Sequence, residues 1–224
     1  MILPILNYPD KRLRTKAKHV DVVDKTIQTL IKDMFETMYA KDGIGLAATQ
    51  VDQHLQVVVI DVSDSQDDYQ LLLKNCQKDS HKQPQKHHPL CFINPKIKEK
   101  DGQEKHIEGC LSVPDFQAEV QRSNHIKVEA LNEKGEVFTL QATGLLAICI
   151  QHELDHLKGI LFVDYLSKLK QKRLLEKTKK MIKGASLCQS KLARTSLARK
   201  YYSTPWLALV TSHLDCCENP KVRH

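Results

Sequence analysis

Long hydrophobic runs are missing from this chain of 224 residues. Hydrophobic residues make up 41% of it, yet no run approaches the roughly 18 consecutive apolar residues that a membrane helix needs. The first residues, MILPILNYPDKRLR, lack the cationic leader, sustained apolar core and cleavage site of an export signal. We therefore expect a soluble, cytoplasmic protein that does not bind a membrane.

A regular cysteine framework is also missing. The seven cysteines form an odd number and are irregularly spaced, at positions 76, 91, 110, 149, 188, 216 and 217. Disulfide-stapled domains usually carry an even, patterned set, so this distribution indicates reduced thiols. Some of these thiols are then available as metal ligands.

Acidic residues are scarce in the C-terminal part of the chain. Residues 168 to 224 hold 14 Lys and Arg against 3 Asp and Glu, a net charge of +11. Residues 1 to 167 hold 20 against 24, a net charge of −4. A basic segment of this kind can approach nucleic acid or another polyanion, and it can equally be the solvated face of a helix.

Hydrophobic periodicity predicts the main elements. Residues 24 to 41 repeat apolar side chains every 3.6 residues, with Asp24 as an N-cap, and predict an amphipathic helix. Residues 55 to 61 predict a strand, and residues 126 to 141 predict a hairpin. A second helical pattern follows at residues 145 to 159. Strands that precede a late, central helix favour an α+β fold with antiparallel or mixed sheets around that helix.

The length favours one compact domain with appendages. We place this domain at residues 1 to 183, ending with a very basic C-terminal helix from about 165 to 182. Residues 64 to 90 are rich in Gln, Lys, Asp and His and predict a long surface loop. Its three histidines could bind metal, although a solvated polar loop is the commoner outcome. Residues 184 to 224 form a tail to which we assign no role.

The chemistry concentrates in the second helix, at QHELDH, residues 151 to 156. Residues four apart share one helix face, so His152 and His156 present two imidazoles to one metal ion, in line with the apolar stripe. Glu153 stands where HExxH enzymes place the acid/base that takes a proton from water. Asp155 is either an acceptor for an imidazole N–H or a surface carboxylate. The alternative for the whole motif is an ordinary helix with two satisfied core histidines.

A catalytic site of this type needs a third protein ligand. In the extended HExxHxxGxxH arrangement the last position is Phe162, which cannot bind metal. Glu176 lies about 20 residues after the second histidine, as in peptidases with a distant glutamate, although its surroundings are strongly basic. Cys110, in EGCLSVP, is either a thiolate ligand or a small buried hydrophobe.

Three separated motifs together favour Cys110 as a metal ligand. They are GIGLAATQ at residues 43 to 50, EGCLS at 108 to 112, and QHELDH. In that order they resemble the three motifs of the peptide deformylases, bacterial metallohydrolases that remove the formyl group from the N-terminal formyl-methionine of new chains. The resemblance covers about residues 1 to 183 as the catalytic domain. It departs in the 64 to 90 loop, in the tail, and at a Pro-Asp pair that follows EGCLS where many members have Pro-Gly.

The resemblance implies three ligands for one metal ion per chain: Cys110, His152 and His156. It implies Fe²⁺ as the native ion, with Zn²⁺ or another divalent ion possible. Metal-bound hydroxide would attack the formyl carbon, with Glu153 as general acid and base. The side-chain amide of Gln50 and the backbone N–H of Leu111 would, together with the metal, stabilise the oxyanion.

The resemblance also implies an apolar slot for the methionine side chain. Its walls would be Ile44, Gly45, Leu145, Ile148 and Cys149. The alternative is that these residues belong to the plain core. A further implied contact, between Arg122 and Glu108, would lie beneath the ligand loop.

The partners implied by the resemblance are nascent formyl-methionine polypeptides. From the +11 charge of the C-terminal part we also predict ribosome association through the basic C-terminal helix, because formylated chains first appear where they leave the ribosome. Two other functions compete with this interpretation. One is a zinc peptidase that uses Glu176 as its third ligand. The other is a basic RNA-binding or ribosome-associated protein with a structural metal, which requires a fourth ligand that no obvious spacing supplies.

Overall fold

A computed structural model describes residues 1–63 and 89–180. The chain divides into two units, Met1–Leu174 and Leu175–His224, and the fold below is that of the first unit. The predicted tail lies outside the described residues, as does the predicted loop with its three histidines, apart from residues 89 and 90, where a strand begins.

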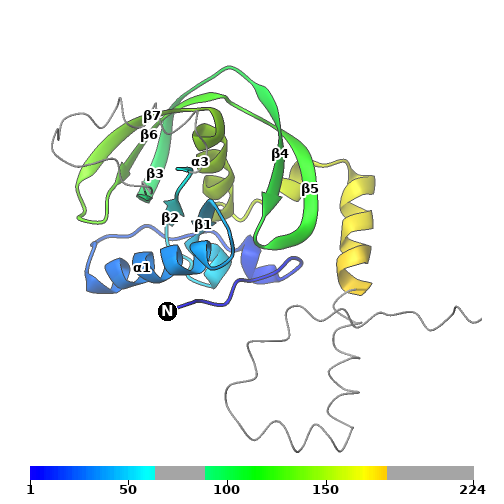
Figure 1. The fold of residues 1–224 in the computed structure, drawn as a ribbon, viewed down its shortest axis with the longest axis horizontal. Helices are drawn as coiled ribbons and strands as arrows, with labels where there is room; N and C mark the ends of the chain where they lie inside the picture. Colours follow the sequence, from blue (N-terminus) through cyan, green and yellow to red (C-terminus); the bar gives the residue numbers. More distant parts are fainter. Residues whose placement is uncertain (64–88, 181–224) are drawn as a thin grey trace, which may run out of the picture. The chain divides into compact units, whose positions relative to one another are not determined.

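Within residues 1–63 and 89–165, the described elements are three short 3-10 helices (η1 to η3), two α-helices and seven strands (Figure 1). They are η1 (Lys11–Arg14), α1 (Lys25–Tyr39), β1 (Gly45–Ala47), η2 (Ala48–Val51), β2 (Val57–Ile60), β3 (Leu90–Asp101), β4 (Glu104–Cys110), β5 (Val113–Arg122), β6 (His125–Leu131), β7 (Val137–Thr143), α3 (Gly144–Leu157) and η3 (Phe162–Tyr165). Residues 168–180 are also helical.

The strands form two antiparallel sheets. One has five strands in the order β1-β2-β3-β6-β7, and the other consists of β4 and β5 alone. The predicted hairpin at 126 to 141 is confirmed as β6 and β7, which pair from His125 with Thr143 to Leu131 with Val137. Antiparallel sheets, together with the helices, give the α+β class expected from the sequence.

The amphipathic helix predicted at 24 to 41 is confirmed as α1. The side chain of Asp24 accepts a hydrogen bond from the backbone N–H of Ile27 at 3.0 Å, and such a cap typically stabilises a helix by about 1 kcal/mol. The buried face of α1, which includes Ile31, Met34 and Met38, packs in a core cluster with residues of β1, β2 and β3. This packing places the loop that follows α1 beside the sheet.

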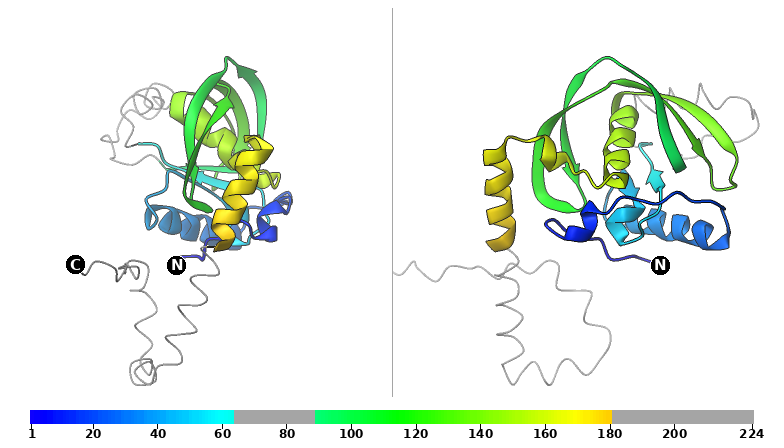
Figure 2. Two further views of the ribbon diagram at one scale, coloured as in Figure 1. Left: turned by 90° about the vertical axis from the view of Figure 1, so that its right-hand side faces the viewer. Right: turned by 180° about the vertical axis from the view of Figure 1, so that it is seen from behind.

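Helix α3 lies between the two sheets (Figures 1 and 2). Towards the five-stranded sheet, Ile150 and Leu154 share a core cluster with Val58 of β2, Val128 of β6 and other strand residues. On its other side, polar residues of α3 bond to residues of β4 and β5. Because both sides are covered, every residue from 146 to 157 is buried.

The basic helix predicted from about 165 begins later in the structure. The chain forms the 3-10 helix η3 at Phe162–Tyr165, and the helical residues begin at 168 and reach 180, the last described residue. Leu166 is buried in a core cluster with Phe162, and the side chain of Asp164 accepts from the N–H of Leu161 at 2.9 Å. These contacts hold η3 and Leu166 in place before the next helix begins.

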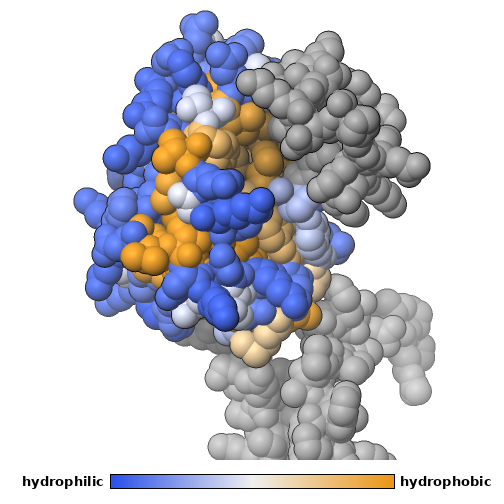
Figure 3. Space-filling view, turned by 90° about the vertical axis from the view of Figure 1, so that its left-hand side faces the viewer, coloured by the Kyte–Doolittle hydropathy of each residue, from blue (hydrophilic) through white to orange (hydrophobic). Residues whose placement is uncertain are grey.

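Figure 3 shows one face of the molecule, where hydrophobic surface gathers between hydrophilic borders. A cavity of about 600 Å³ is lined by Ile31, Phe35 and Tyr39 of α1 and by Glu133 and Lys134 of the β6–β7 turn. Among residues 1–63 and 89–180, no helix has both the length and the apolar character needed to cross a membrane.

Candidate metal centre and active-site cleft

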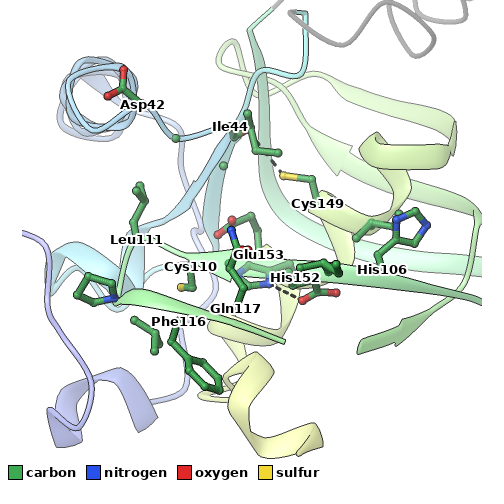
Figure 4. A pocket seen from close by; sticks show the side chains of 18 of the residues that line it. Asp42, Ile44, His106, Cys110, Leu111, Phe116, Gln117, Cys149, His152 and Glu153 are labelled. Carbon is green, nitrogen blue, oxygen red and sulfur yellow. Dashed lines mark hydrogen bonds and ion pairs between the residues drawn. The ribbon is translucent and has the colours of Figure 1, made fainter. Parts of the chain in front are cut away.

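A cleft of about 770 Å³ opens between α3, β4, the start of β5 and the loop before β1 (Figure 4). Side chains of Ile44, Cys110, Cys149, His152 and Glu153 all line it. The three motifs are distant in the sequence, so the folding of β1, β4 and α3 around this cleft is what brings them together.

Cys110, His152 and His156 form the group of potential metal ligands found among the described residues, with ligand atoms that all lie within 4.8 Å of one another. Cys110 Sγ lies 3.2 Å from Nε2 of His156. Both histidines come from α3 and are buried, whereas Cys110 ends β4, where the β4–β5 register shifts. Glu176, the rival third ligand, is exposed.

Glu108 holds the first histidine from behind. His152 Nδ1 lies 2.9 Å from Glu108 Oε2, so its Nε2 is the nitrogen left for an ion. Arg122 of β5 donates two hydrogen bonds to the same carboxylate, at 2.7 and 3.0 Å. This is the Arg122–Glu108 pair implied by the family resemblance.

Asp155 fits neither interpretation offered by the sequence. It is only 7% exposed, so it is not a surface carboxylate. Its carboxylate contacts Arg122 Nη1, the hydroxyl of Tyr165 at 2.7 Å and, more loosely, Lys158, so it does not hold an imidazole. The buried guanidinium of Arg122 explains why Asp155 lies there. Glu108 alone leaves one Arg122 nitrogen unpaired, and Asp155 pairs with it.

The ionisable side chains of Glu108, Arg122 and the two histidines affect one another's pKa values. Burial opposes the ionisation of Glu108, but hydrogen bonds from His152 and Arg122 outweigh it and lower the pKa of Glu108 to about 2. Burial would also lower the pKa of His152, but its hydrogen bonds to Cys110 and Glu108 raise it well above the usual value. Burial, with the charges of His152 and Arg122, lowers the pKa of His156, which favours the neutral, metal-binding imidazole.

Glu153 faces the cleft without a full set of partners. Its Oε2 is buried and has no hydrogen-bond partner, and the same is true of Nδ1 of His156, so these are not satisfied core residues. Burial raises the pKa of Glu153 to about 7. An unpartnered carboxylate oxygen beside one cysteine sulfur and two imidazoles fits a site built for a divalent ion and a water molecule.

Gln50 is fixed at the edge of the ligand group. Its Oε1 accepts from the backbone N–H of Ala47 at 2.8 Å, and its Nε2 donates to Ser112 Oγ at 3.1 Å and to Cys110 Sγ at 3.6 Å. Sequence reasoning missed Ser112, although it stands inside the EGCLS motif. Leu111, the residue after the cysteine, also lines the cleft.

All five residues predicted for the methionine slot line the cleft. Ile44 is 42% exposed, so it is not a plain core residue. Gly45 has no room for a side chain, because an added Cβ would lie 2.5 Å from Glu153 Oε1 and 2.8 Å from Cys149 Sγ. Because position 45 has no side chain, Glu153 and Cys149, one of the residues predicted for the methionine slot, can both lie close to it.

The α+β fold and this group of thiol, imidazole and carboxylate side chains define a metal-dependent hydrolase. The model of the polypeptide deformylase family matches residues 2–172, more than half of the chain. The chain belongs to the polypeptide deformylase family. Its described fold and its three motifs agree with that membership.

Curated relatives match over nearly their whole length. The peptide deformylase of Neisseria meningitidis serogroup B is 55% identical over 179 residues, which cover 80% of this chain and 95% of that protein. The peptide deformylase of Teredinibacter turnerae is 50% identical over 183 residues, covering 81% and 97%. The expectation of a bacterial peptide deformylase is confirmed, and the zinc-peptidase alternative is wrong.

Solved structures agree. The crystal structure of peptide deformylase from Ehrlichia chaffeensis is 40% identical and has a TM-score of 0.69, covering 81% of this chain and 97% of that one. A second structure of the same protein, in complex with actinonin, gives 39% identity and a TM-score of 0.68, covering 80% and 97%. As a peptide deformylase the chain is a metal-dependent hydrolase that removes the N-terminal formyl group from nascent polypeptides.

Proposed function

We propose that Cys110, His152 and His156 hold one divalent ion, natively Fe²⁺, and that deformylation of formyl-methionine takes place beside it. The close approach of the three ligand atoms carries this proposal. A Cys/His/His set suits Zn²⁺ as well as Fe²⁺. When bound, the ion supplies the Lewis acidity that makes a water molecule nucleophilic near neutral pH.

Glu153 moves the proton. Its buried, unpartnered oxygen faces the cleft, and burial raises its pKa to about 7, close to the value that suits a group that both takes and returns a proton near neutrality. Glu153 takes the proton from the attacking water and returns it to the departing amine. Without the second transfer, the C–N bond would have to expel a poor anionic leaving group.

Gln50 and Leu111 hold the formyl oxygen as negative charge develops on it. The side-chain amide of Gln50 is held by Ala47 and Ser112, and its other N–H, which makes only the 3.6 Å contact with Cys110 Sγ, is the donor to the formyl oxygen. The backbone N–H of Leu111 is the second donor. The loss of one such donor typically costs about 3 kcal/mol of transition-state stabilisation.

Selectivity for methionine comes from the apolar slot. Ile44, Leu145 and Ile148 provide hydrocarbon walls, and Gly45 lets the substrate backbone approach closely. The formyl group is too small to carry selectivity, so the side chain of the first residue has to supply it.

The proposal is tested by metal analysis combined with hydrolysis of a formyl-Met peptide under oxygen-free conditions. Glu153→Gln keeps the shape of the side chain but cannot shuttle a proton, so we expect one ion per chain and a turnover reduced by about 10² or more. A variant with near-normal turnover would remove Glu153 from the mechanism. A wild-type enzyme that binds no metal would overturn the ligand set.

We further propose that the enzyme is cytoplasmic and that residues 1 to 183 form its catalytic domain. We also propose that its basic helix docks on the ribosome. Residues 168–180 carry seven Lys and Arg against one Glu, and all seven are exposed. Such a helix suits ribosomal RNA or an acidic ribosomal surface, and docking would raise the local concentration of substrate.

Ribosome docking is tested by co-sedimentation at low and high salt. The docking variant changes six cations to Gln: Lys170, Lys172, Arg173, Lys177, Lys179 and Lys180. A matched control changes six exposed lysines of the first unit: Lys11, Lys16, Lys18, Lys25, Lys41 and Lys100. We expect only the docking variant to lose low-salt co-sedimentation, because phosphate contacts are local and salt-dependent. Deletion of residues 184 to 224 should leave small-peptide deformylation intact, and equal losses in both variants would reject a specific site.

A further inference from the structure

A chain of buried contacts leads from His152 to the surface of the enzyme. It runs from His152 Nδ1 to Glu108 at 2.9 Å, and from Glu108 to Arg122 at 2.7 and 3.0 Å. Arg122 Nη1 then pairs with Asp155 Oδ2, and the same oxygen accepts from the Tyr165 hydroxyl at 2.7 Å. Four elements contribute to this chain: α3, β4, β5 and η3.

Every inner member of the chain depends on its neighbour for position. Glu108 and Arg122 are each 6% exposed, so neither side chain can be held by bulk water. Breaking a buried ion pair by removing one partner leaves an uncompensated charge, and the remaining groups rotate or take up water to relieve it. A change at Asp155 is therefore transmitted through the guanidinium to the carboxylate that orients His152.

Tyr165 closes the outer end. Its ring lies under the guanidinium of Arg122, 5.0 Å from ring centre to Cζ, and its hydroxyl meets Asp155. The residue is 52% exposed, so it covers the buried charges while facing solvent. Neither role was visible in the sequence, where Tyr165 stands in GILFVDYLS without any chemical motif.

We propose that Asp155 and Tyr165 are positioning residues for the metal centre, which act on His152 through Arg122 and Glu108 and slow the loss of the bound ion. Outer partners of metal ligands typically change metal affinity by about 10-fold to 100-fold when they are removed. The inference rests on the ligand set proposed above, and it adds two residues that touch neither the ion nor the substrate.

The experiment measures the rate at which zinc-loaded, full-length enzyme transfers Zn²⁺ to an excess of a chromogenic chelator. Tyr165→Phe removes one hydroxyl and keeps the ring under Arg122, and we expect zinc loss to be faster by about 10-fold. Asp155→Asn removes the charge opposite Arg122, and we expect an increase nearer 100-fold.

Tyr39→Phe is the matched control. Tyr39 also donates its hydroxyl to a carboxylate, that of Asp61 at 2.6 Å, and is 41% exposed, but Asp61 follows β2 and is not one of the groups in the chain of contacts behind His152. Thermal unfolding of the metal-free proteins should show similar losses for the two Tyr→Phe variants, while only Tyr165→Phe speeds zinc loss.

Equal zinc-loss rates in the two Tyr→Phe variants, or an unchanged rate in Tyr165→Phe, would overturn the positioning role. Failure of the proposed ligand set has a different signature. In that case wild-type enzyme would bind no stoichiometric zinc, or Cys110→Ala would bind it as tightly as wild type. The two failures are therefore distinguishable in one set of measurements.

Discussion

The side of α3 that faces the five-stranded sheet buries apolar side chains, whereas the side that faces β4 and β5 buries ionisable ones. Ile150 and Leu154 pack among strand residues, and full burial of such a side chain contributes about 1.5–3 kcal/mol. Across the helix, His152 and Asp155 meet Glu108 and Arg122. A buried ionic cluster of this kind contributes little net stability, because desolvation offsets the attraction between the charges. One side of the helix holds the fold together, and the other holds the proposed metal centre.

We expect the largest effect on metal binding from removal of Cys110, the proposed ligand at the end of β4. Cys110→Ala should abolish tight metal binding, because two histidines alone leave the ion without its third protein ligand. Glu176→Ala should leave metal binding intact, since we propose Cys110 and not Glu176 as the third ligand and the Glu176 side chain is exposed. Metal content after dialysis measures both variants, and the opposite pattern would contradict the proposed ligand set.

Truncation on the apolar side should have the complementary effect. Ile150→Ala removes a side chain that is fully buried, and we expect the free energy of unfolding to fall by about 2–5 kcal/mol. The folded fraction should still bind one ion per chain, because Ile150 belongs to the core cluster rather than to the cleft. Urea unfolding and metal analysis measure the two quantities. Loss of metal from protein that remains folded would show that the two sides of α3 are not separable.

The two sheets can also be compared, with a smaller expected effect on stability. Each contains a residue other than glycine with positive φ. Asn94 of β3 has a φ of 52° and bonds to the backbone N–H and C=O of Val20, at 2.9 and 2.8 Å. Asp115 of β5 has a φ of 58°, is exposed, and bonds through its side chain to no described residue. This is the Pro-Asp position where the family often has glycine.

Substitution by glycine should therefore have opposite signs at the two positions. Asn94→Gly should destabilise the protein by about 2 kcal/mol, because buried backbone groups of Val20 lose their partners. Asp115→Gly should stabilise it by about 0.5 kcal/mol, because relief of the left-handed conformation slightly exceeds the entropy cost of glycine. Urea unfolding of the metal-free proteins measures both changes, and a loss of stability in Asp115→Gly would indicate that its carboxylate has a structural role.

Interactions between residues close together in the sequence determine several elements of this protein, so the sequence alone predicted them. The 3.6-residue period and the Asp24 cap define α1, and alternation defines the β6–β7 hairpin, because these patterns depend on neighbours a few residues apart. The spacing within QHELDH placed His152 and His156 on one face of α3 for the same reason. The start of the basic helix was misplaced because η3 is set by tertiary burial of Leu166 and Phe162.

Tertiary structure brought together the distant groups of the proposed metal centre. The basic surroundings of Glu176 and the motif resemblance favoured Cys110 as the third ligand, but only the fold of β4 and β5 placed Cys110 beside His156. The partner of Asp155 was likewise unpredictable, since a carboxylate on a helix is equally suited to solvent, to an imidazole or to a guanidinium. Its choice depends on burial and on the approach of Arg122 from another strand, and these follow from chain packing rather than from sequence spacing.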